Sequence, residues 1–143
     1  MSTATNKAIV SRYNEQLWNQ GRLDLADEFL AEDVVEHGAP QLPGMNGRDS
    51  LKAIIAGMRK SLPDIQVTLH EVIAEDDKVV TYWTMKATHQ GELMGVPATG
   101  KQLTNTGVGI YRLAGARIVE IRVIADNLGF MQQLGVVPTL ESA

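Results

Sequence analysis

The segment Arg117–Asp126 is a β-like run that ends on a carboxylate, and the helix-like stretch Asn127–Gly135 follows it directly. An acid in this position has two interpretations. Aspartate is a favoured helix N-cap, so Asp126 can simply begin the next helix. Alternatively, Asp126 faces an apolar cavity, where desolvation would raise its pKa and let it exchange a proton with a carbon acid or a carbonyl group. The two roles differ in rotamer and depth, and the sequence leaves both open.

Alternation along this strand predicts two unlike faces. One face is wholly apolar and comprises Val119, Ile121, Val123 and Ala125; the other comprises Ile118, Glu120, Arg122, Ile124 and Asp126. Glu120 and Arg122 are two residues apart, roughly 6.6 Å along a strand, which is within reach of an ion pair. We therefore interpret Arg122 as the partner of Glu120, with an anionic group of a substrate as the alternative partner.

Histidine and aromatic residues supply the other candidate ligand contacts. His89 shares a strand face with Trp83 and Met85, which suits stacking against a flat ligand, although a structural histidine at a strand end is the alternative. His37 ends a short β-like segment, where it either points into the same cavity or lies at the edge of a loop. Tyr13 lies on the apolar stripe of an N-terminal helix, as a core residue or a ligand contact.

Composition excludes several classes of protein. The 143 residues fit one domain spanning 1–143, and their 44% hydrophobic and 21% charged residues are typical of a globular chain. No apolar run approaches the roughly 20 residues that cross a bilayer, and the N-terminus lacks a signal-peptide pattern, so we expect a cytoplasmic protein without membrane contact. A net charge of −4 and scattered basic residues argue against nucleic-acid binding.

The residue inventory also limits the chemistry. Cysteine is absent, which removes thiol nucleophiles and thiolate metal sites, and the three histidines lack metal-ligand spacing, so no metal is predicted. Phosphate-binding loops and nucleophile elbows are also missing, so we expect acid–base chemistry without a cofactor. The expected partners are a small hydrophobic molecule and further copies of the chain, as a homodimer or higher homo-oligomer.

The change of hydrophobic period along the chain predicts an α+β fold. Helices are expected at Thr5–Asn19, ended by Gly21, at Leu23–Leu30, and at Gly47–Ser61 with Asn46 as N-cap; a short strand at Val34–His37 precedes a loop at Gly38–Gly44. Four strands follow at Ile65–Ala74, Lys78–His89, Lys101–Leu113 and Arg117–Asp126. We expect the helices to cover one face of a curved sheet and so to enclose a cavity.

Ordered motifs along most of the chain resemble the SnoaL-like polyketide cyclase family of the nuclear transport factor 2-like superfamily. The matching segments are Leu17–Gly21, Leu25–Leu30, Asp33–His37, Pro43–Gly47, Leu62–Asp64, Thr88–Gly100 and Ile118–Gly135. The resemblance implies a cone-shaped α+β barrel, homo-oligomeric through its sheet, with a hydrophobic pocket. It also implies a cofactor-free intramolecular aldol cyclisation of a polyketide, with Asp126 as general acid/base and His37 and His89 at pocket positions.

The chain departs from the family pattern at two positions. Many members carry tryptophan where this chain has Arg122, and arginine where it has Tyr82. A pocket-facing Arg122 would indicate a more polar or anionic ligand. Hydrolase or isomerase activity on a small lipophilic molecule, or ligand binding without turnover, are the alternative functions.

Overall fold

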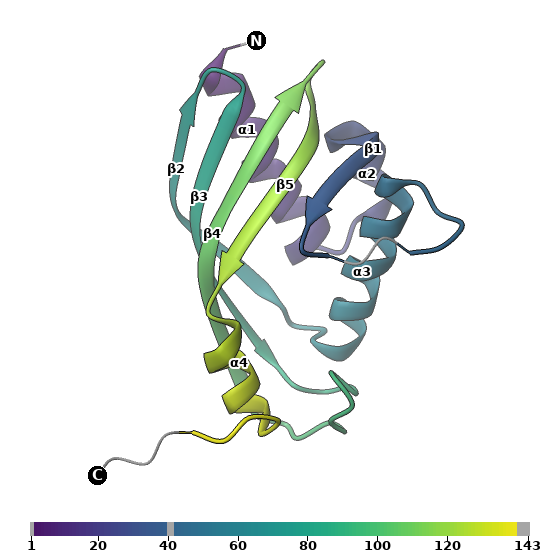
Figure 1. The fold of residues 1–143 in the computed structure, drawn as a ribbon, viewed down its shortest axis with the longest axis vertical. Helices are drawn as coiled ribbons and strands as arrows, with labels where there is room; N and C mark the ends of the chain where they lie inside the picture. Colours follow the sequence, from purple (N-terminus) through teal and green to yellow (C-terminus); the bar gives the residue numbers. More distant parts are fainter. Residues whose placement is uncertain (1, 40–41, 140–143) are drawn as a thin grey trace.

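Five strands form one curved, mixed sheet in the computed structural model, which describes residues 2–39 and 42–139 (Figure 1). The strands β2 (Gln66–Glu75), β3 (Lys78–Thr88), β4 (Gln102–Ala114) and β5 (Arg117–Ala125) form an antiparallel meander. The strand β1 (Leu30–His37) pairs in parallel with β5, which gives the order β1-β5-β4-β3-β2. The edge strands β1 and β2 do not pair within the described part of the chain, so the cone-shaped barrel is open on one side.

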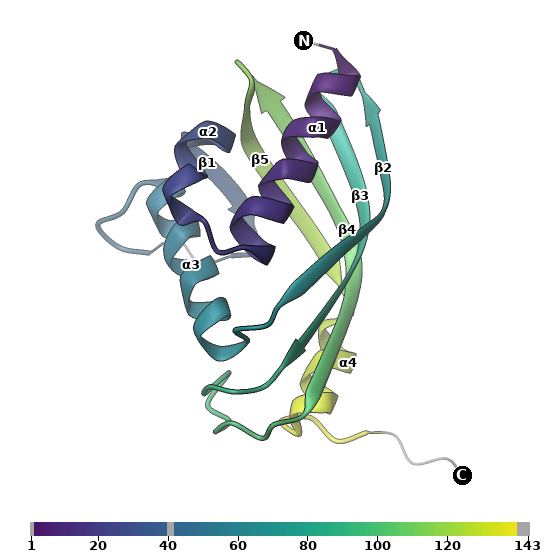
Figure 2. The same cartoon turned by 180° about the vertical axis from the view of Figure 1, so that it is seen from behind.

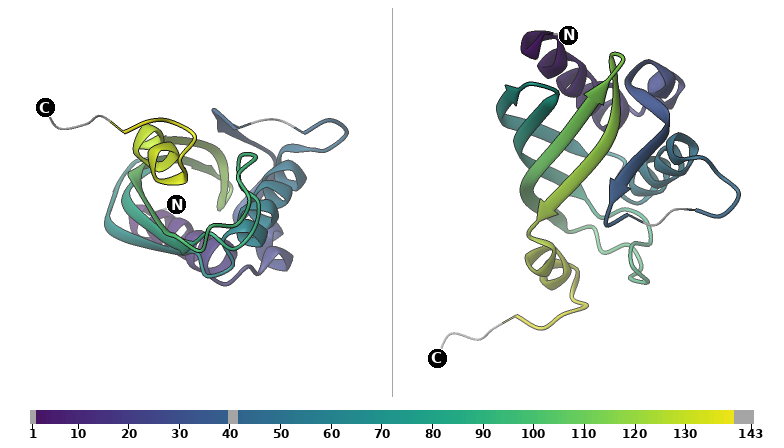
Figure 3. Two further views of the ribbon diagram at one scale, coloured as in Figure 1. Left: turned by 90° about the horizontal axis from the view of Figure 1, so that it is seen from below. Right: turned by 45° about the horizontal axis from the view of Figure 1, so that its top comes forward.

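Helices cover the concave face of this sheet and leave its convex face bare (Figures 1 and 2). α1 (Thr3–Tyr13) packs on β2 and β3 and continues as the π-helical segment η1 (Asn14–Asn19). A 3₁₀ turn, η2 (Leu23–Leu25), and the short α2 (Ala26–Phe29) lead to β1, against which α3 (Gly47–Ser61) packs. The C-terminal α4 (Asn127–Leu134) lies at the narrow lower end, beneath the curl of the sheet (Figure 3).

The expected elements agree with the structure wherever a local signal marks their ends. α3 has the predicted bounds, and the Asn46 side chain accepts a hydrogen bond of 2.8 Å from the Asp49 N–H, as an N-cap does. The four predicted strands of the meander are present, each within one residue of its expected ends. Residues 40 and 41 of the predicted loop Gly38–Gly44 lie outside the described residues.

The N-terminal third differs from the prediction in three places. The first helix is α-helical only to Tyr13 and then widens to a π-helix. The predicted second helix ends at Phe29, because Leu30 already has extended backbone and begins β1. β1 is accordingly longer than the predicted strand. Pairing with β5 holds Leu30 in an extended conformation, although local propensity alone predicted a helix there.

A β-bulge at Val119 changes which residues of β5 point inward. Leu113 pairs with Ile118 and Arg112 pairs with Glu120, so Val119 is an extra residue in the ladder. Ile118 and Ile121 are both buried as a result, although strict alternation placed them on opposite faces.

Two apolar clusters make up the core. One lies between α1, β1 and α3 and the upper part of the sheet, and the other gathers Leu62, Ile65, Met85 and Phe130 near α4. Trp18 packs against both clusters. None of the described helices has the length and apolar character that a membrane crossing requires.

Candidate active site

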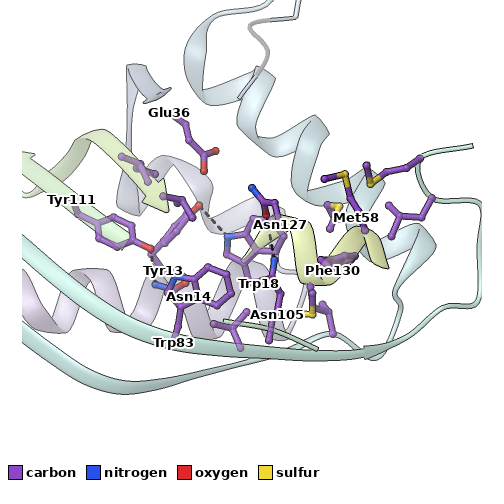
Figure 4. A pocket seen from close by; sticks show the side chains of 18 residues that line it. Tyr13, Asn14, Trp18, Glu36, Met58, Trp83, Asn105, Tyr111, Asn127 and Phe130 are labelled. Carbon is purple, nitrogen blue, oxygen red and sulfur yellow. Dashed lines mark hydrogen bonds between the residues drawn. The ribbon is translucent and has the colours of Figure 1, made fainter. Parts of the chain in front are cut away.

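A cavity of about 540 Å³ lies between the helices and the concave face of the sheet (Figure 4). Most of its wall is apolar or aromatic, and a few polar groups interrupt it. Such a wall is typical of a small-molecule site, in which apolar surface binds and isolated polar groups orient the ligand. Its lining residues are Tyr13, Asn14, Trp18, Glu36, Met58, Ile65, Val67, Trp83, Met85, Leu93, Met94, Asn105, Tyr111, Ile121, Val123, Asn127, Phe130 and Met131.

The π-helical segment η1 positions one wall of this cavity. Residues five apart lie about 140° apart around an ordinary α-helix and point in different directions. The wider π turn, closed by i→i+5 hydrogen bonds, brings such residues nearly into line. Tyr13 and Trp18 therefore share a face, and the Trp18 Nε1 donates a hydrogen bond of 3.2 Å to the Tyr13 hydroxyl.

Two buried tyrosines close the inner end of the cavity. The rings of Tyr13 and Tyr111 meet edge to face, with centroids 6.1 Å apart and planes at 68°. Asn14 Nδ2 donates to the Tyr111 hydroxyl at 3.3 Å. Burial raises the pKa of Tyr13 well above its usual value and that of Tyr111 to about 12, so both hydroxyls keep their protons at neutral pH.

Glu36 brings a carboxyl group to the same end of the cavity (Figure 4). Burial raises its pKa, and its negative charge in turn helps to raise the pKa of Tyr13 and of Tyr111. Apart from these two tyrosines, Glu36 is the sole titratable residue among the described residues that line the cavity. The sequence analysis did not select it.

Met94 and Asn127 line the cavity and are both exposed, and we call the part of the cavity beside them its mouth. Asn105 Nδ2, on β4, donates to Asn127 Oδ1 at 3.4 Å and so ties the sheet to the start of α4.

Asp126 lies beside this mouth and adopts the helix-cap arrangement. Its Oδ1 accepts a hydrogen bond of 3.0 Å from the Gly129 N–H, and its side chain is exposed rather than part of the cavity wall. A Cβ on residue 129 would collide with this carboxylate, so the glycine makes room for the cap. The expected cavity-facing placement is thus not observed, and a catalytic role for Asp126 stays a prediction.

His37 and Arg122 both lie outside the cavity, contrary to their placement in the predicted pocket. Val34 and Glu36 point inward from β1, so His37 points outward. Arg122 likewise projects away from the Ile121 face of β5.

The two residues instead join a surface cluster around Glu120. His37 Nε2 lies 2.9 Å, Arg112 Nε 3.5 Å and Arg122 Nη2 3.9 Å from Glu120 carboxylate oxygens. The hydrogen bond from His37 is the main cause of the lowered pKa of Glu120. The predicted Glu120–Arg122 ion pair is therefore confirmed.

Of the remaining predicted ligand contacts, three line the cavity and His89 does not. Tyr13, Trp83 and Met85 line the cavity as expected. His89 is fully buried but lies beyond the last part of β3 that reaches the cavity, where its Nδ1 is 2.9 Å from the Thr99 hydroxyl. Its Nε2 is buried without a hydrogen-bond partner among the described residues, and a ligand-binding role for His89 stays a prediction.

Gly107 on β4 makes room for the Trp83 ring. A Cβ at this position would lie 2.8 Å from Trp83 Cζ2 and 2.5 Å from the Ile124 carbonyl oxygen. The small residue therefore lets the indole approach the backbone of β4 closely.

The described residues contain no group of three or more His, Asp or Glu side chains that could hold a metal ion. The sequence analysis missed Glu36, Asn14, Tyr111, Asn105 and Asn127 as lining residues. Glu36 had a readable signal, because it alternates with the apolar Val34 on one face of a strand.

Comparison of the sequence with known protein families identifies the family of this chain. The sequence model of the SnoaL-like polyketide cyclase family matches residues 8–134. The chain therefore belongs to the SnoaL-like polyketide cyclase family, as the ordered motifs indicated.

Relatives with similar sequences are named as methyl ester cyclases. The aklanonic acid methyl ester cyclase DnrD of Streptomyces peucetius is 25% identical over 123 residues, which cover 84% of each chain. The nogalonic acid methyl ester cyclase of Streptomyces nogalater is 25% identical over 120 residues, covering 82% of this chain and 89% of the relative.

Solved structures share the fold. A protein from Acidithiobacillus ferrooxidans assigned as a polyketide cyclase superposes with a TM-score of 0.81 at 28% identity, covering 95% of this chain and 99% of its own. AclR from Streptomyces galilaeus, assigned as a hydroxylase, gives 0.84 at 26% identity, with 98% and 87% covered. The fold is thus shared by proteins of different assigned activity, and the reaction must be argued from the site.

Proposed function

We propose that this protein is a cofactor-independent cyclase that closes a ring in a hydrophobic, polyketide-like ligand by intramolecular aldol reaction. The observation that carries the proposal is the apolar cavity with its few polar groups. Its volume of about 540 Å³ lies in the range of roughly 300–1,000 Å³ that small-molecule sites occupy. Trp18 and Trp83 offer flat surfaces for a ligand of fused or folding rings.

The reaction requires that the ligand chain be folded in the right orientation and that one proton be removed and returned. A base removes a proton from a carbon flanked by carbonyl groups, and the resulting enolate carbon attacks a carbonyl carbon of the same chain. A carbon–carbon bond forms, the carbonyl becomes an alkoxide, and a proton returns to that oxygen. Because no atom is gained or lost, the cavity has only to fold the chain and manage the proton.

Asp126 is the proton carrier that we propose from its match to the family aspartate. It directly precedes Asn127, which lines the mouth of the cavity. Its Oδ1 is held by the Gly129 N–H, and Oδ2 is the oxygen proposed to exchange the proton. This role requires the ligand to extend to the mouth, or the side chain to turn from the cap toward the cavity.

The test is turnover of aklanonic acid methyl ester and of nogalonic acid methyl ester by the purified protein, with mass detection of the products. Ring closure predicts a product of unchanged mass, whereas ester hydrolysis predicts one lighter by a methylene unit. Asp126→Asn should lower the rate by about 100-fold or more if Asp126 carries the proton. An unchanged rate in this variant contradicts its catalytic role, and saturable binding without any product indicates a binding protein.

The convex face of the sheet supports the expected self-association. Tyr82, Val108 and Ile124 are paired across β3, β4 and β5 and form an exposed apolar row, with 45, 36 and 71% of their surfaces accessible. Helices leave this face uncovered (Figure 1). We propose a homodimer, or a higher homo-oligomer, that buries this row.

A further inference from the structure

The inner end of the cavity holds a carboxylic acid that no part of the mechanism above uses. Glu36 lies on β1, opposite Ile121 of β5. Its side chain points toward the side of the cavity that holds the Tyr13 hydroxyl (Figure 4). Asp126 lies five residues beyond Ile121, about 16 Å further along the strand. The two carboxyl groups therefore serve opposite ends of the cavity and cannot act on one proton together.

A carboxylate costs free energy in such surroundings unless a partner stabilises it. Among the described residues that line the cavity none is a cation. Besides Glu36, the titratable ones are Tyr13 and Tyr111, and both stay neutral. On α3, which packs against β1, Arg48 pairs with an acid of α2, and Arg59 donates to backbone carbonyl oxygens of η1. An unpaired acid retained in an apolar cavity is a candidate for proton transfer.

We propose that Glu36 is a catalytic acid–base residue that removes a proton from a carbon next to a ligand carbonyl, with the Tyr13 hydroxyl donating a hydrogen bond to that carbonyl oxygen. The ligand class is therefore an apolar ketone or 1,3-dicarbonyl compound that enters carbonyl end first. The inference extends the proposed function to this end of the cavity but does not require ring closure.

The step balances within these groups. The Glu36 carboxylate takes the proton as the carbon–hydrogen bond breaks, and the electron pair moves to the carbonyl oxygen to form an enolate. The enolate then either attacks a second carbonyl of the ligand or takes the proton back from Glu36.

Tyr13 is arranged to stabilise the enolate oxygen. Its hydroxyl oxygen accepts the N–H of Trp18, which orients the hydroxyl and polarises its own proton for donation. A neutral donor with a high pKa holds negative charge on the ligand without surrendering its proton.

Deuterium exchange separates this inference from ring closure. The probe is 2-tetralone, an apolar bicyclic ketone that cannot close a further ring, and its exchange in D₂O is followed by NMR with the full-length protein. Binding is followed in parallel by tryptophan fluorescence, because both tryptophans of the chain line the cavity.

We expect the wild-type protein to accelerate exchange and Glu36→Gln to lose about 100-fold of that acceleration while still binding the ketone. Glu36→Asp should recover part of the rate, and Glu32→Gln, the same change at an exposed position of β1, should leave it unchanged. The rate should rise with pH through a carboxyl pKa above the ordinary range, because the carboxylate is the reactive form.

Wild-type exchange at the buffer rate would overturn the inference, as would full acceleration by Glu36→Gln. Ring closure of the esters without Glu36-dependent exchange refutes the role of Glu36 and leaves the cyclase proposal standing. Glu36-dependent exchange without ring closure supports the role of Glu36 and refutes the cyclase proposal.

Discussion

The indole N–H of Trp18 donates to the hydroxyl of Tyr13, five residues earlier, across a turn of π-helix. This hydrogen bond links the aromatic middle of the cavity to its buried inner end. It depends on the helix widening after Tyr13, because a regular α-helix would point the two side chains in different directions. The π-helix is thus a structural requirement of the site.

Replacing Tyr13 with phenylalanine should lower the free energy of unfolding by about 1–3 kcal/mol, because the Trp18 N–H loses its acceptor in a part-buried place. Urea unfolding followed by tryptophan fluorescence measures the change. Tyr82→Phe is the matched control: it removes a hydroxyl from the exposed convex face and should shift stability by less than about 0.5 kcal/mol. Equal effects of the two substitutions would refute a structural role for the Tyr13–Trp18 hydrogen bond.

Gly107→Ala should destabilise the fold by about 1–3 kcal/mol and disturb the cavity, since the new methyl group overlaps both the Trp83 ring and the Ile124 carbonyl oxygen. Gly57→Ala provides the contrast. Gly57 is exposed on α3 with open space around its Cβ position, so alanine there should raise stability by up to about 1 kcal/mol. Chemical denaturation of both variants tests the pair, and a neutral Gly107→Ala would show that β4 and Trp83 move apart easily.

The raised pKa of Glu36 predicts a pH dependence of stability. The folded protein holds the Glu36 proton more tightly than the unfolded chain, so this residue lowers stability as pH rises from the ordinary carboxyl pKa through its raised value. Glu36→Gln should therefore raise the melting temperature at neutral pH and have little effect under acid conditions, where both states are protonated. A melting-temperature difference that is the same at both pH values would contradict the burial of this carboxyl group.

The apolar row on the convex face predicts the mode of association. Ile124→Lys places a charge in the middle of the proposed interface and should shift the protein to monomer in sedimentation velocity at micromolar concentration. Val136→Lys, an equally drastic change at an exposed residue after α4, should leave the assembly intact. A wild-type monomer under the same conditions would rule out the sheet-mediated dimer.

Elements with local signals were predictable from the sequence. α3 combines an apolar stripe, the Asn46 cap and a proline soon after its end, and the structure matches it residue for residue. The meander follows from alternation and short polar joints. Leu30 was misassigned because its extended backbone is imposed by pairing with β5, a contact 88 residues away that local propensity does not contain.

The site was harder to predict, because the register of each strand decides which of its side chains point into the cavity. Strict alternation on β5 fails at the Val119 bulge. On β1, His37 was considered as a cavity residue, whereas the neighbouring Glu36 is the residue that lines the cavity. Asn14 and Tyr111 come from a helix and a strand far apart in the chain, and only the packing of the helices on the sheet brings them together. Asp126 illustrates the remaining ambiguity, because a capping residue and a proton carrier have the same sequence signature.

The central claim is that the ligand binds and reacts inside the cavity. A crystal structure of the Asp126→Asn variant with unreacted aklanonic acid methyl ester tests it most directly, since we expect this variant to turn the ester over slowly. We predict the ester between Trp18 and Trp83, with a carbonyl oxygen within hydrogen-bonding distance of the Tyr13 hydroxyl. An ester bound outside the cavity, or an empty cavity at saturating ester, would contradict the account.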